Sequence, residues 1–185
     1  MKFTKGEWVM REGVKAFNCN QIREARLSED GTSVYLYAVP YKEDVRGLGG
    51  PVQEIVVSSP QKDVIRIHTC HFKGILAKIP SFELNDAKVK LGYTDESGIV
   101  NIRSGDTELR IEKSPCSIAF YYKGEKITQI GSRYGSPVLS YMQTPDGPFM
   151  RAQLDVAVGE KVYGLGERFT PFVKNGQVVE IWNED

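Results

Sequence analysis

Hydrophobic and polar residues alternate along most of this chain, which is the pattern of a β-strand with one buried face. The clearest case is Ser33–Val39, a β-branched and aromatic run that follows the turn signal Asp30-Gly31 and stops at Pro40. Similar runs predict strands at 53–58, 63–69, 87–93, 98–103, 108–113, 117–122, 126–130 and 151–156. The pattern therefore predicts a chain built almost wholly from strands.

Turn-forming residues separate these runs at intervals of roughly 8–12 residues, as in proteins made of antiparallel sheets. Ser59-Pro60-Gln61-Lys62 predicts one hairpin, and Gly124 predicts a second, tight one. Residues 23–27 have a composition that a helix tolerates, and 82–87 would fit a short turn, but neither has a cap followed by an apolar stripe. We therefore expect an all-β fold with antiparallel sheets packed as a sandwich.

Two segments interrupt the strand pattern. Residues 41–51 hold three glycines within four positions after a charged cluster, which predicts a flexible loop or positive φ angles. This loop is either a solvated connection between strands or an arm that reaches a ligand or partner. Residues 133–149 are rich in glycine and proline, and we expect them to wander over the surface.

Composition places the chain among globular proteins. Its 185 residues, 41% of them hydrophobic and 26% charged, suit one domain that buries about 70% of its unfolded surface. The 24 basic and 24 acidic residues balance, so neither nucleic acid nor an anionic membrane is the expected partner. The first residues lack an apolar signal segment, and no run approaches the roughly 20 apolar residues of a spanning helix. We expect a soluble, cytoplasmic protein.

Cysteine and histidine usage argues against disulfides and metals. Cys19, Cys70 and Cys116 are far apart and odd in number, which indicates free thiols in a reducing compartment. His68-Thr69-Cys70-His71 would be a candidate metal cluster, yet on a strand His68 and Cys70 point one way and His71 the other. No second ligand pair has zinc-type spacing, so we expect no metal and no cofactor.

No motif supplies a complete catalytic site. Gly164-Leu165-Gly166 lacks the third glycine and the following helix of a phosphate-binding loop. The carboxylate pairs Asp95-Glu96 and Glu184-Asp185 are sequence neighbours, whereas the two carboxyl groups of a glycosidase face each other across the substrate. We therefore predict no catalytic residue in this chain.

The last 30 residues carry the most specific pattern. The runs Tyr163-Gly164-Leu165-Gly166-Glu167-Arg168-Phe169 and Trp182-Asn183-Glu184-Asp185 resemble the N-terminal β-domain of glycoside hydrolase family 31, and within it the bacterial α-xylosidases. Residues 1–3, 6–10, 59–61 and 71–74 resemble the same proteins, so the resemblance covers essentially the whole chain and is weakest between 80 and 149.

This resemblance implies a galactose-mutarotase-like supersandwich. In the family this domain precedes a (β/α)8 barrel whose two aspartates carry out a retaining double displacement, followed by C-terminal β-domains. We therefore expect residues 1–185 to be an N-terminal β-sandwich fragment, incomplete at its C-terminal end, with the barrel and the later domains absent. Such a fragment would be inactive alone.

The function that the resemblance implies is hydrolysis of terminal α-xylosyl residues from oligosaccharides by the full-length protein. Alternatives are a family 31 α-glucosidase and a non-catalytic β-sandwich for carbohydrate binding or assembly. A carbohydrate-binding module would need an exposed aromatic platform. Strand alternation predicts instead that half of the tyrosines in Tyr35/Tyr37 and Tyr121/Tyr122 are buried.

One residue is implied as a substrate contact. Asp185 matches a family aspartate that binds sugar hydroxyls near the cleavage point, and a carboxylate accepts such hydrogen bonds about twice as strongly as a neutral group. The preceding residue is Glu184 where relatives usually carry arginine.

Four further residues are candidates for the rim of the site. Glu167 and Arg168 match the family's loop and are expected to shape it by an ion pair or a backbone tie. Trp182 stacks on a sugar or anchors a core. Arg46 lies in the glycine-rich loop, which in such α-xylosidases reaches a neighbouring subunit, so a homo-oligomer is expected for the full-length protein.

Overall fold

The computed structural model describes residues 3–5, 9–40, 50–71, 87–133, 136–137, 139–167 and 169–181. Strands β1 to β16 are the regular elements of this part of the chain, which contains no helix and hence none able to cross a membrane. The predicted all-β class is confirmed.

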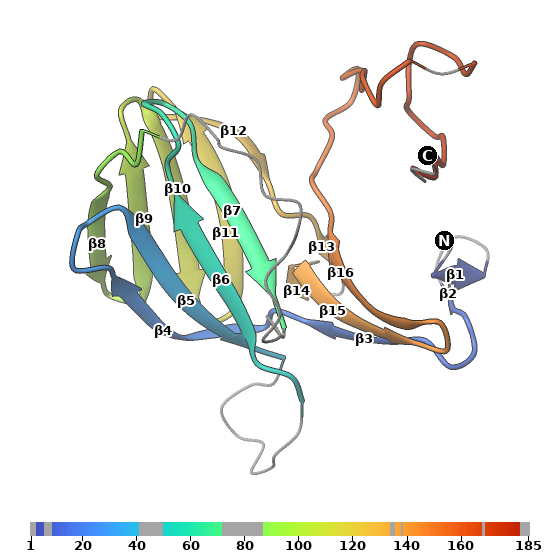
Figure 1. Ribbon diagram of the computed structural model, residues 1–185, viewed down its shortest axis with the longest axis horizontal. Helices are drawn as coiled ribbons and strands as arrows, with labels where there is room; N and C mark the ends of the chain where they lie inside the picture. The colour runs from blue at the N-terminus through green and yellow to red at the C-terminus, as the bar shows by residue number, and fades with distance from the viewer. Residues whose placement is uncertain are drawn as a thin grey trace.

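Two antiparallel sheets form the body of the molecule (Figure 1). The first has the order β4 (Gln21–Leu27), β5 (Ser33–Val39), β6 (Gln53–Ser58) and β7 (Arg66–Cys70). The second has the order β12 (Glu125–Gln129), β11 (Cys116–Tyr122), β10 (Thr107–Lys113), β9 (Ile99–Ser104) and β8 (Gly92–Glu96). The sheets lie face to face and make a sandwich.

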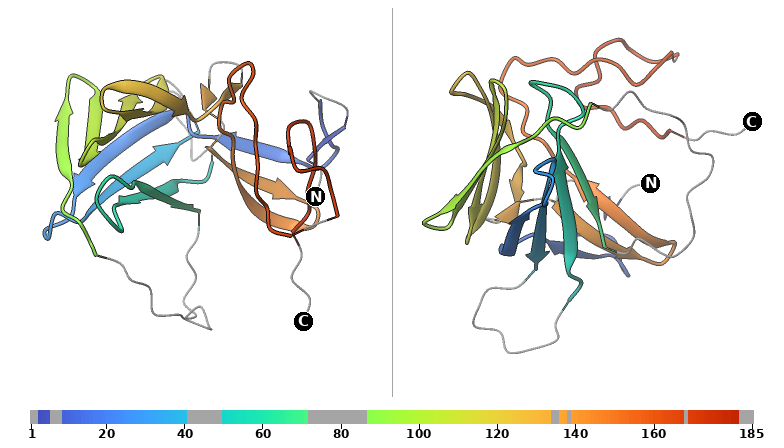
Figure 2. Two further views of the ribbon diagram at one scale, coloured as in Figure 1. Left: turned by 90° about the horizontal axis from the view of Figure 1, so that it is seen from above. Right: turned by 60° about the vertical axis from the view of Figure 1, so that its left-hand side comes forward.

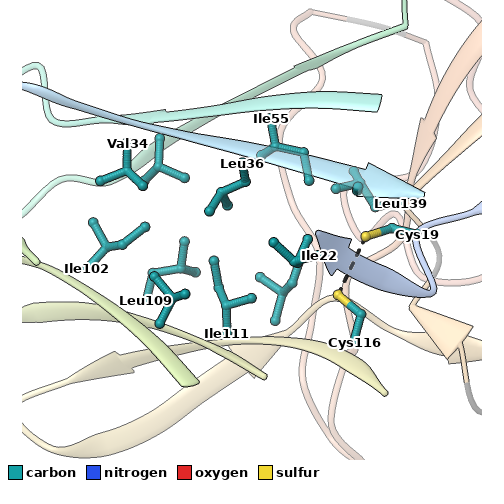
Figure 3. Packing of buried hydrophobic residues seen from close by; sticks show 14 of the residues in the cluster. Cys19, Ile22, Val34, Leu36, Ile55, Ile102, Leu109, Ile111, Cys116 and Leu139 are labelled. Carbon is teal, nitrogen blue, oxygen red and sulfur yellow. Dashed lines mark hydrogen bonds between the residues drawn. The ribbon is translucent and has the colours of Figure 1, made fainter. Parts of the chain in front are cut away.

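The core lies between these sheets, and side-chain alternation builds it. In β5, Val34, Leu36 and Ala38 are fully buried, while Tyr35 and Tyr37 lie on the other face and are half-buried. The facing sheet contributes aliphatic side chains of the same kind, namely Val100, Ile102, Leu109, Ile111 and Ile118. Figure 3 shows Ile102, Leu109 and Ile111 opposite Val34 and Leu36. Each of the larger side chains stabilises the fold by about 1.5–3 kcal/mol when it is fully buried.

A third sheet extends sideways from the sandwich, in the order β16 (Gly147–Ala152), β15 (Leu139–Thr144) and β3 (Lys15–Asn18) (Figure 1). It joins the first sheet because β3 continues into β4 through Cys19 and Asn20. Two short pairs complete the fold, β1 (Thr4–Lys5) with β2 (Val9–Met10) and β13 (Ser132–Arg133) with β14 (Ser136–Pro137).

The predicted turns are confirmed. The segment that contains Ser59-Pro60-Gln61-Lys62 joins the antiparallel strands β6 and β7. Between β11 and β12, Lys123 and Gly124 have φ angles of 49° and 83°, the left-handed pair that a two-residue hairpin needs. Before β5, Gly31 has a φ of 70°, and the Asp30 carboxylate accepts hydrogen bonds from Ser28 Oγ and from the Thr32 backbone N–H.

Several boundaries differ from the prediction. Residues 23–27 belong to strand β4, because pairing with β5 outweighs their helical composition. The strand expected at 87–93 begins only at Gly92, and the one expected at 63–69 begins at Arg66, because Asp63 adopts a turn conformation with φ 67°. In the segment 82–87 only Ala87 is among the described residues, and of 41–51 only Gly50 and Pro51 are.

The largest error concerns residues 133–149, which were expected to be a surface loop. They contain β14, all of β15 and the start of β16. Glycine and proline there mark the turns of a hairpin, since Thr144 pairs with Gly147 across Pro145 and Asp146. The strand expected at 151–156 is the end of this hairpin, which stops at Ala152 and leaves a single bridge from Leu154 to Ile130.

Candidate functional site

The C-terminal segment 153–181 leaves the sandwich, and its described residues, 153–167 and 169–181, form irregular chain with no strand of their own (Figure 1). It is fastened at its start, where the Gly131 N–H donates to Gln153 O at 2.7 Å and the Asp155 N–H donates to Gln129 O at 3.0 Å. Beyond this point the segment turns away from the sheets, as Figure 1 and the right view of Figure 2 show. The family-like motif of residues 163–169 therefore lies on a projecting arm.

Hydrogen bonds within the arm close residues 160–175 into a loop. Asn175 makes two of them: its Oδ1 accepts from the Val162 N–H at 2.8 Å, and its Nδ2 donates to Glu160 O at 2.9 Å. The Lys174 N–H adds a backbone bond to Val162 O at 2.8 Å. The two ends of the loop are thus joined by three bonds, which gives the motif between them a defined entry and exit.

Lys174 is the one charged residue classed as buried among the described side chains. Its Nζ donates to Thr170 Oγ1 at 2.7 Å and to Pro171 O at 2.8 Å. Because a buried ammonium group needs hydrogen-bond acceptors, these two contacts explain how the arm tolerates it. Lys174 therefore shapes the loop and does not offer a free charge to a ligand.

The glycines of the motif are required by backbone conformation. Gly164, Leu165 and Gly166 have φ angles of 106°, 69° and 76°, and an added Cβ at either glycine would meet open space. Positive φ at three successive residues makes a tight reversal that side chains other than glycine resist. The two glycines therefore set the path of the backbone through the motif, and the shaping role of Glu167 and Arg168 stays a prediction.

The arm carries a dense set of exposed large hydrophobic side chains. Tyr163 packs on Phe172 with ring centroids 5.0 Å apart, yet Phe172 remains 78% exposed and Phe169 is fully exposed. The exposed apolar residues of this arm are Leu154, Val156, Val158, Val162, Tyr163, Leu165, Phe169, Phe172, Val178 and Ile181. Large exposed apolar areas often mark interaction sites, so this arm is a candidate contact surface.

The structure brings few of the predicted site residues together. Glu167 is exposed and lines a surface hollow of about 470 Å³ with Phe169, Thr170, Val178, Val179 and Glu180. Arg46, Arg168, Trp182 and Asp185 lie outside the described residues, so the Glu167–Arg168 pair and the Asp185 contact stay predictions.

A second concave site was not foreseen from the sequence. A groove of about 520 Å³ lies between the end of β7 and the β15–β16 hairpin, lined by His68, Thr69, Cys70, His71, Tyr141, Pro148, Phe149 and Met150. The His71 ring lies 4.3 Å from the Tyr141 ring, and one His71 nitrogen is 3.1 Å from Val52 O. The short apolar and aromatic run Leu139-Ser140-Tyr141-Met142 was the missed signal, because nearby prolines suggested a loop.

The tyrosine prediction needs correction. Tyr35, Tyr37 and Tyr121 are half-buried and Tyr122 is exposed, so none of the four is buried. Tyr35 and Tyr37 share the outer face of β5 because they are two residues apart, and the guanidinium of Arg26 lies 5.9 Å from the Tyr35 ring centroid. The guanidinium of Arg110 covers the Tyr121 ring, 4.6 Å from the ring centroid. These tyrosines do not form one open platform.

Ionisation in the described residues gives no sign of a general acid. A catalytic carboxylic acid at neutral pH needs a raised pKa. The hydrogen bond from Arg103 lowers the pKa of Glu108, and hydrogen bonds from Ser28 and Thr32 lower the pKa of Asp30 to about 2. The described residues also contain no group of three side chains suited to a metal ion.

Comparison with known proteins defines the class. The family model of the glycosyl hydrolase 31 N-terminal galactose mutarotase-like domain matches residues 54–185, so this chain belongs to that family. Its relatives include an α-xylosidase of Emericella nidulans, 35% identical over 205 residues, and the α-xylosidase XylQ of Lactiplantibacillus pentosus, 30% identical over 191 residues. Each match covers all of this chain but only 26% and 24% of the relative, so the chain spans about a quarter of their length.

Solved structures share the fold. An uncharacterized protein of Listeria monocytogenes, lmo2446, superposes with a TM-score of 0.65 at 16% identity. The cycloalternan-forming enzyme of the same organism, in complex with a pentasaccharide substrate, superposes with a TM-score of 0.64 at 17% identity. Both alignments cover 92% of this chain and 15% of the other, which confirms the β-sandwich architecture.

Proposed function

We propose that this chain is the N-terminal accessory domain of a retaining α-xylosidase. In this proposal the full-length protein removes terminal α-xylosyl residues from oligosaccharides, and a catalytic domain outside these 185 residues supplies the nucleophile and the acid. The family membership and the two relatives named as α-xylosidases support it. The relatives are about four times as long as the matched region, which leaves room for such a domain.

The observation that carries the proposal is the apolar arm. Ten large hydrophobic side chains between Leu154 and Ile181 are exposed to water in this chain. Burying them would stabilise the protein by roughly 25 cal/mol for each Å² removed from water. A neighbouring domain of the same polypeptide is the occupant that the length of the relatives favours. The arm would then be held against the catalytic domain with its loop 160–175 at the rim of the active site.

The site residues take their roles from this placement. Asp185, a few residues beyond the arm, would accept hydrogen bonds from sugar hydroxyls, and Glu167, Arg168 and Trp182 would shape the same rim. Arg46, in the glycine-rich loop, would contact a neighbouring subunit of a homo-oligomer. We place the protein in the cytoplasm because its three cysteines are free thiols.

Two alternatives remain in the same family or fold. A family 31 α-glucosidase would use this domain in the same way, because the pocket that separates xylose from glucose would lie on the catalytic domain. A carbohydrate-binding module is favoured by one observation, the groove between His71, Tyr141 and Phe149. Calorimetric titration of the 185-residue chain with xylose-containing oligosaccharides separates the accessory domain from the carbohydrate-binding module. The absence of a heat of binding supports the accessory role, and measurable binding contradicts it.

The role of Asp185 is testable in the full-length protein. Replacing a charged acceptor that binds the substrate costs about 1.5–3 kcal/mol, so Asp185→Ala should lower kcat/KM for an aryl α-xyloside by roughly 10- to 100-fold. The matched control is Asp146→Ala, an exposed aspartate in the β15–β16 turn, which should keep wild-type kinetics. Equal kinetics for both variants would remove Asp185 from the site. A stop codon directly after Asp185 in the natural gene would remove the whole proposal.

A further inference from the structure

Two of the three cysteines, 97 residues apart in the sequence, meet in the core. Their Sγ atoms are 3.5 Å apart, and both side chains are buried, Cys19 completely and Cys116 to all but 4% (Figure 3). Cys19 lies between β3 and β4, and Cys116 is the first residue of β11 on the facing sheet. The contact therefore spans the two sheets of the sandwich.

The backbone holds both cysteines in place. The Cys116 N–H donates to Asn20 O at 3.0 Å, next to Cys19, and the Cys19 N–H donates to Leu139 O at 3.0 Å. Leu139 begins β15, so the pair lies where all three major sheets meet. Since each cysteine is anchored by its own main-chain bond, the two sulfur atoms stay opposite each other.

We infer that Cys19 and Cys116 form an oxidisable dithiol, which closes to an intramolecular disulfide and joins the three sheets at their common corner. A disulfide bond is about 2.05 Å long, so closure requires the two sulfur atoms to approach each other by roughly 1.5 Å. Cys19 and Cys116 are free thiols in the structure, so the structure shows the reduced state of this pair.

The oxidant is a low-molecular-weight disulfide, written RSSR. One cysteine thiolate attacks a sulfur of RSSR, which breaks that S–S bond, releases RS⁻ and leaves a mixed disulfide on the protein. The second cysteine thiolate attacks the protein sulfur of the mixed disulfide, forms the Cys19–Cys116 bond and releases the second RS⁻. The two protons lost by the cysteines end on the two RS⁻ ions, so the products are the protein disulfide and two RSH.

Burial controls the rate of this reaction. The hydrogen bond with Cys19 and the apolar surroundings raise the pKa of the Cys116 thiol, which keeps it protonated in the folded protein. The attacking species is the thiolate, so the folded protein should react slowly. Refolding in the presence of RSSR exposes both thiols while the chain closes, and it should capture the pair much faster.

The third cysteine, Cys70, is removed in the test protein. It is only partly buried, on β7 at the aromatic groove, and would react with RSSR to form a mixed disulfide that has no second protein thiol to resolve it. In a Cys70→Ser variant the native pair is intact and no core residue changes. Refolding this variant from urea with oxidised glutathione should reduce the thiol count from two to none, with a Cys19–Cys116 linked peptide in the digest.

The crosslink should also stabilise the fold. It closes a loop of about 100 residues, so the urea midpoint should rise by roughly 1–2 M and return after treatment with a reducing agent. In the same background, Cys19→Ala and Cys116→Ala should each leave one thiol and show no such rise. Two glutathione adducts on the Cys70→Ser variant, or two free thiols after refolding with oxidised glutathione, would overturn the inference.

Discussion

At the scale of single residues, one glycine shows how closely the two sheets approach each other. Gly105 lies in the turn between β9 and β10, and the Asp63 backbone and carboxylate bind that turn from the opposite sheet. Asp63 Oδ1 accepts from the Asp106 N–H at 2.6 Å, and Asp63 O accepts from Thr107 Oγ1 at 2.7 Å. A Cβ on Gly105 would lie 2.0 Å from Asp63 Oδ1, so no other residue fits without breaking this clasp.

The variant Gly105→Ala tests this clasp. Its backbone has φ 56°, where alanine costs about 1–2 kcal/mol, and the displaced Asp63 adds a lost hydrogen bond of about 1–3 kcal/mol. The control is Gly98→Ala, at φ 79° with no atom within 4 Å of the new Cβ, which should show the backbone cost alone. Urea unfolding measures the free energy of unfolding of both variants. Equal losses of stability would mean that the hydrogen bonds from Asp63 to the β9–β10 turn contribute nothing.

The Asp30 carboxylate makes the stability of the turn between β4 and β5 depend on pH. Hydrogen bonds from Ser28 and Thr32 lower the pKa of Asp30 to about 2, below its value in the unfolded chain. A lowered pKa means that the stabilisation is fully present above about pH 4 and is lost as the pH falls to about 2. Wild type and Asp30→Asn should therefore differ in urea midpoint at pH 6 and converge near pH 2. A difference that stays constant over this range would exclude the linkage.

At the scale of elements, the sequence predicted the central strands well and the third sheet poorly. Ser33–Val39 and Gln53–Ser58 have the predicted bounds because the first alternates strictly between a buried and an outer face and the second does so as far as Val57. Strand β15 was missed because the prolines that flank it also mark loops, and only pairing with β3 and β16 shows that they are hairpin turns. The meeting of Cys19 with Cys116 depends on contacts 97 residues apart, which no local pattern contains.

The motif of residues 163–169 was recognised from the sequence, but the closure of residues 160–175 into a loop was not. Asn175 ties the two ends of the loop, and its sequence position alone does not indicate which backbone groups it binds. A side-chain amide can bond to many partners, and tertiary placement selects one set.

Asn175 variants separate the contributions of the two bonds. Asn175→Ala removes the acceptor of the Val162 N–H, and exchange of that amide with deuterium should become roughly five- to tenfold faster, as expected for about 1–1.5 kcal/mol. Asn175→Asp keeps an oxygen acceptor and should preserve the protection of Val162. Because the arm is exposed, the free energy of global unfolding should change by less than about 0.5 kcal/mol in either variant. Unchanged exchange in Asn175→Ala would show that Asn175 does not close the loop.

At the scale of the whole molecule, the chain combines a well-packed sandwich with an arm that exposes apolar residues. The sandwich has its own core, so it is a stable platform. The arm has little core and is fastened mainly at Gly131 and Asp155, where it leaves the sheets. This division fits a domain whose folding is local and whose function depends on contact with a larger structure.

The covering of the arm in the full-length protein is expected to be measurable. Phe169 and Phe172 should be oxidised readily by hydroxyl radicals in the 185-residue chain and protected in the full-length protein, because the proposed catalytic domain buries them. Tyr35, on the outer face of the first sheet, is the internal reference. Equal oxidation of Phe169 in both proteins would contradict a contact at the arm.

The central claim is that this chain serves an α-xylosidase without carrying its chemistry. The most direct test compares hydrolysis of p-nitrophenyl α-D-xyloside by the 185-residue chain and by the full-length protein under the same conditions. We predict turnover by the full-length protein and release by the 185-residue chain that equals the rate without enzyme. Turnover by the chain alone, or no α-xyloside hydrolysis by the full-length protein, would contradict the account.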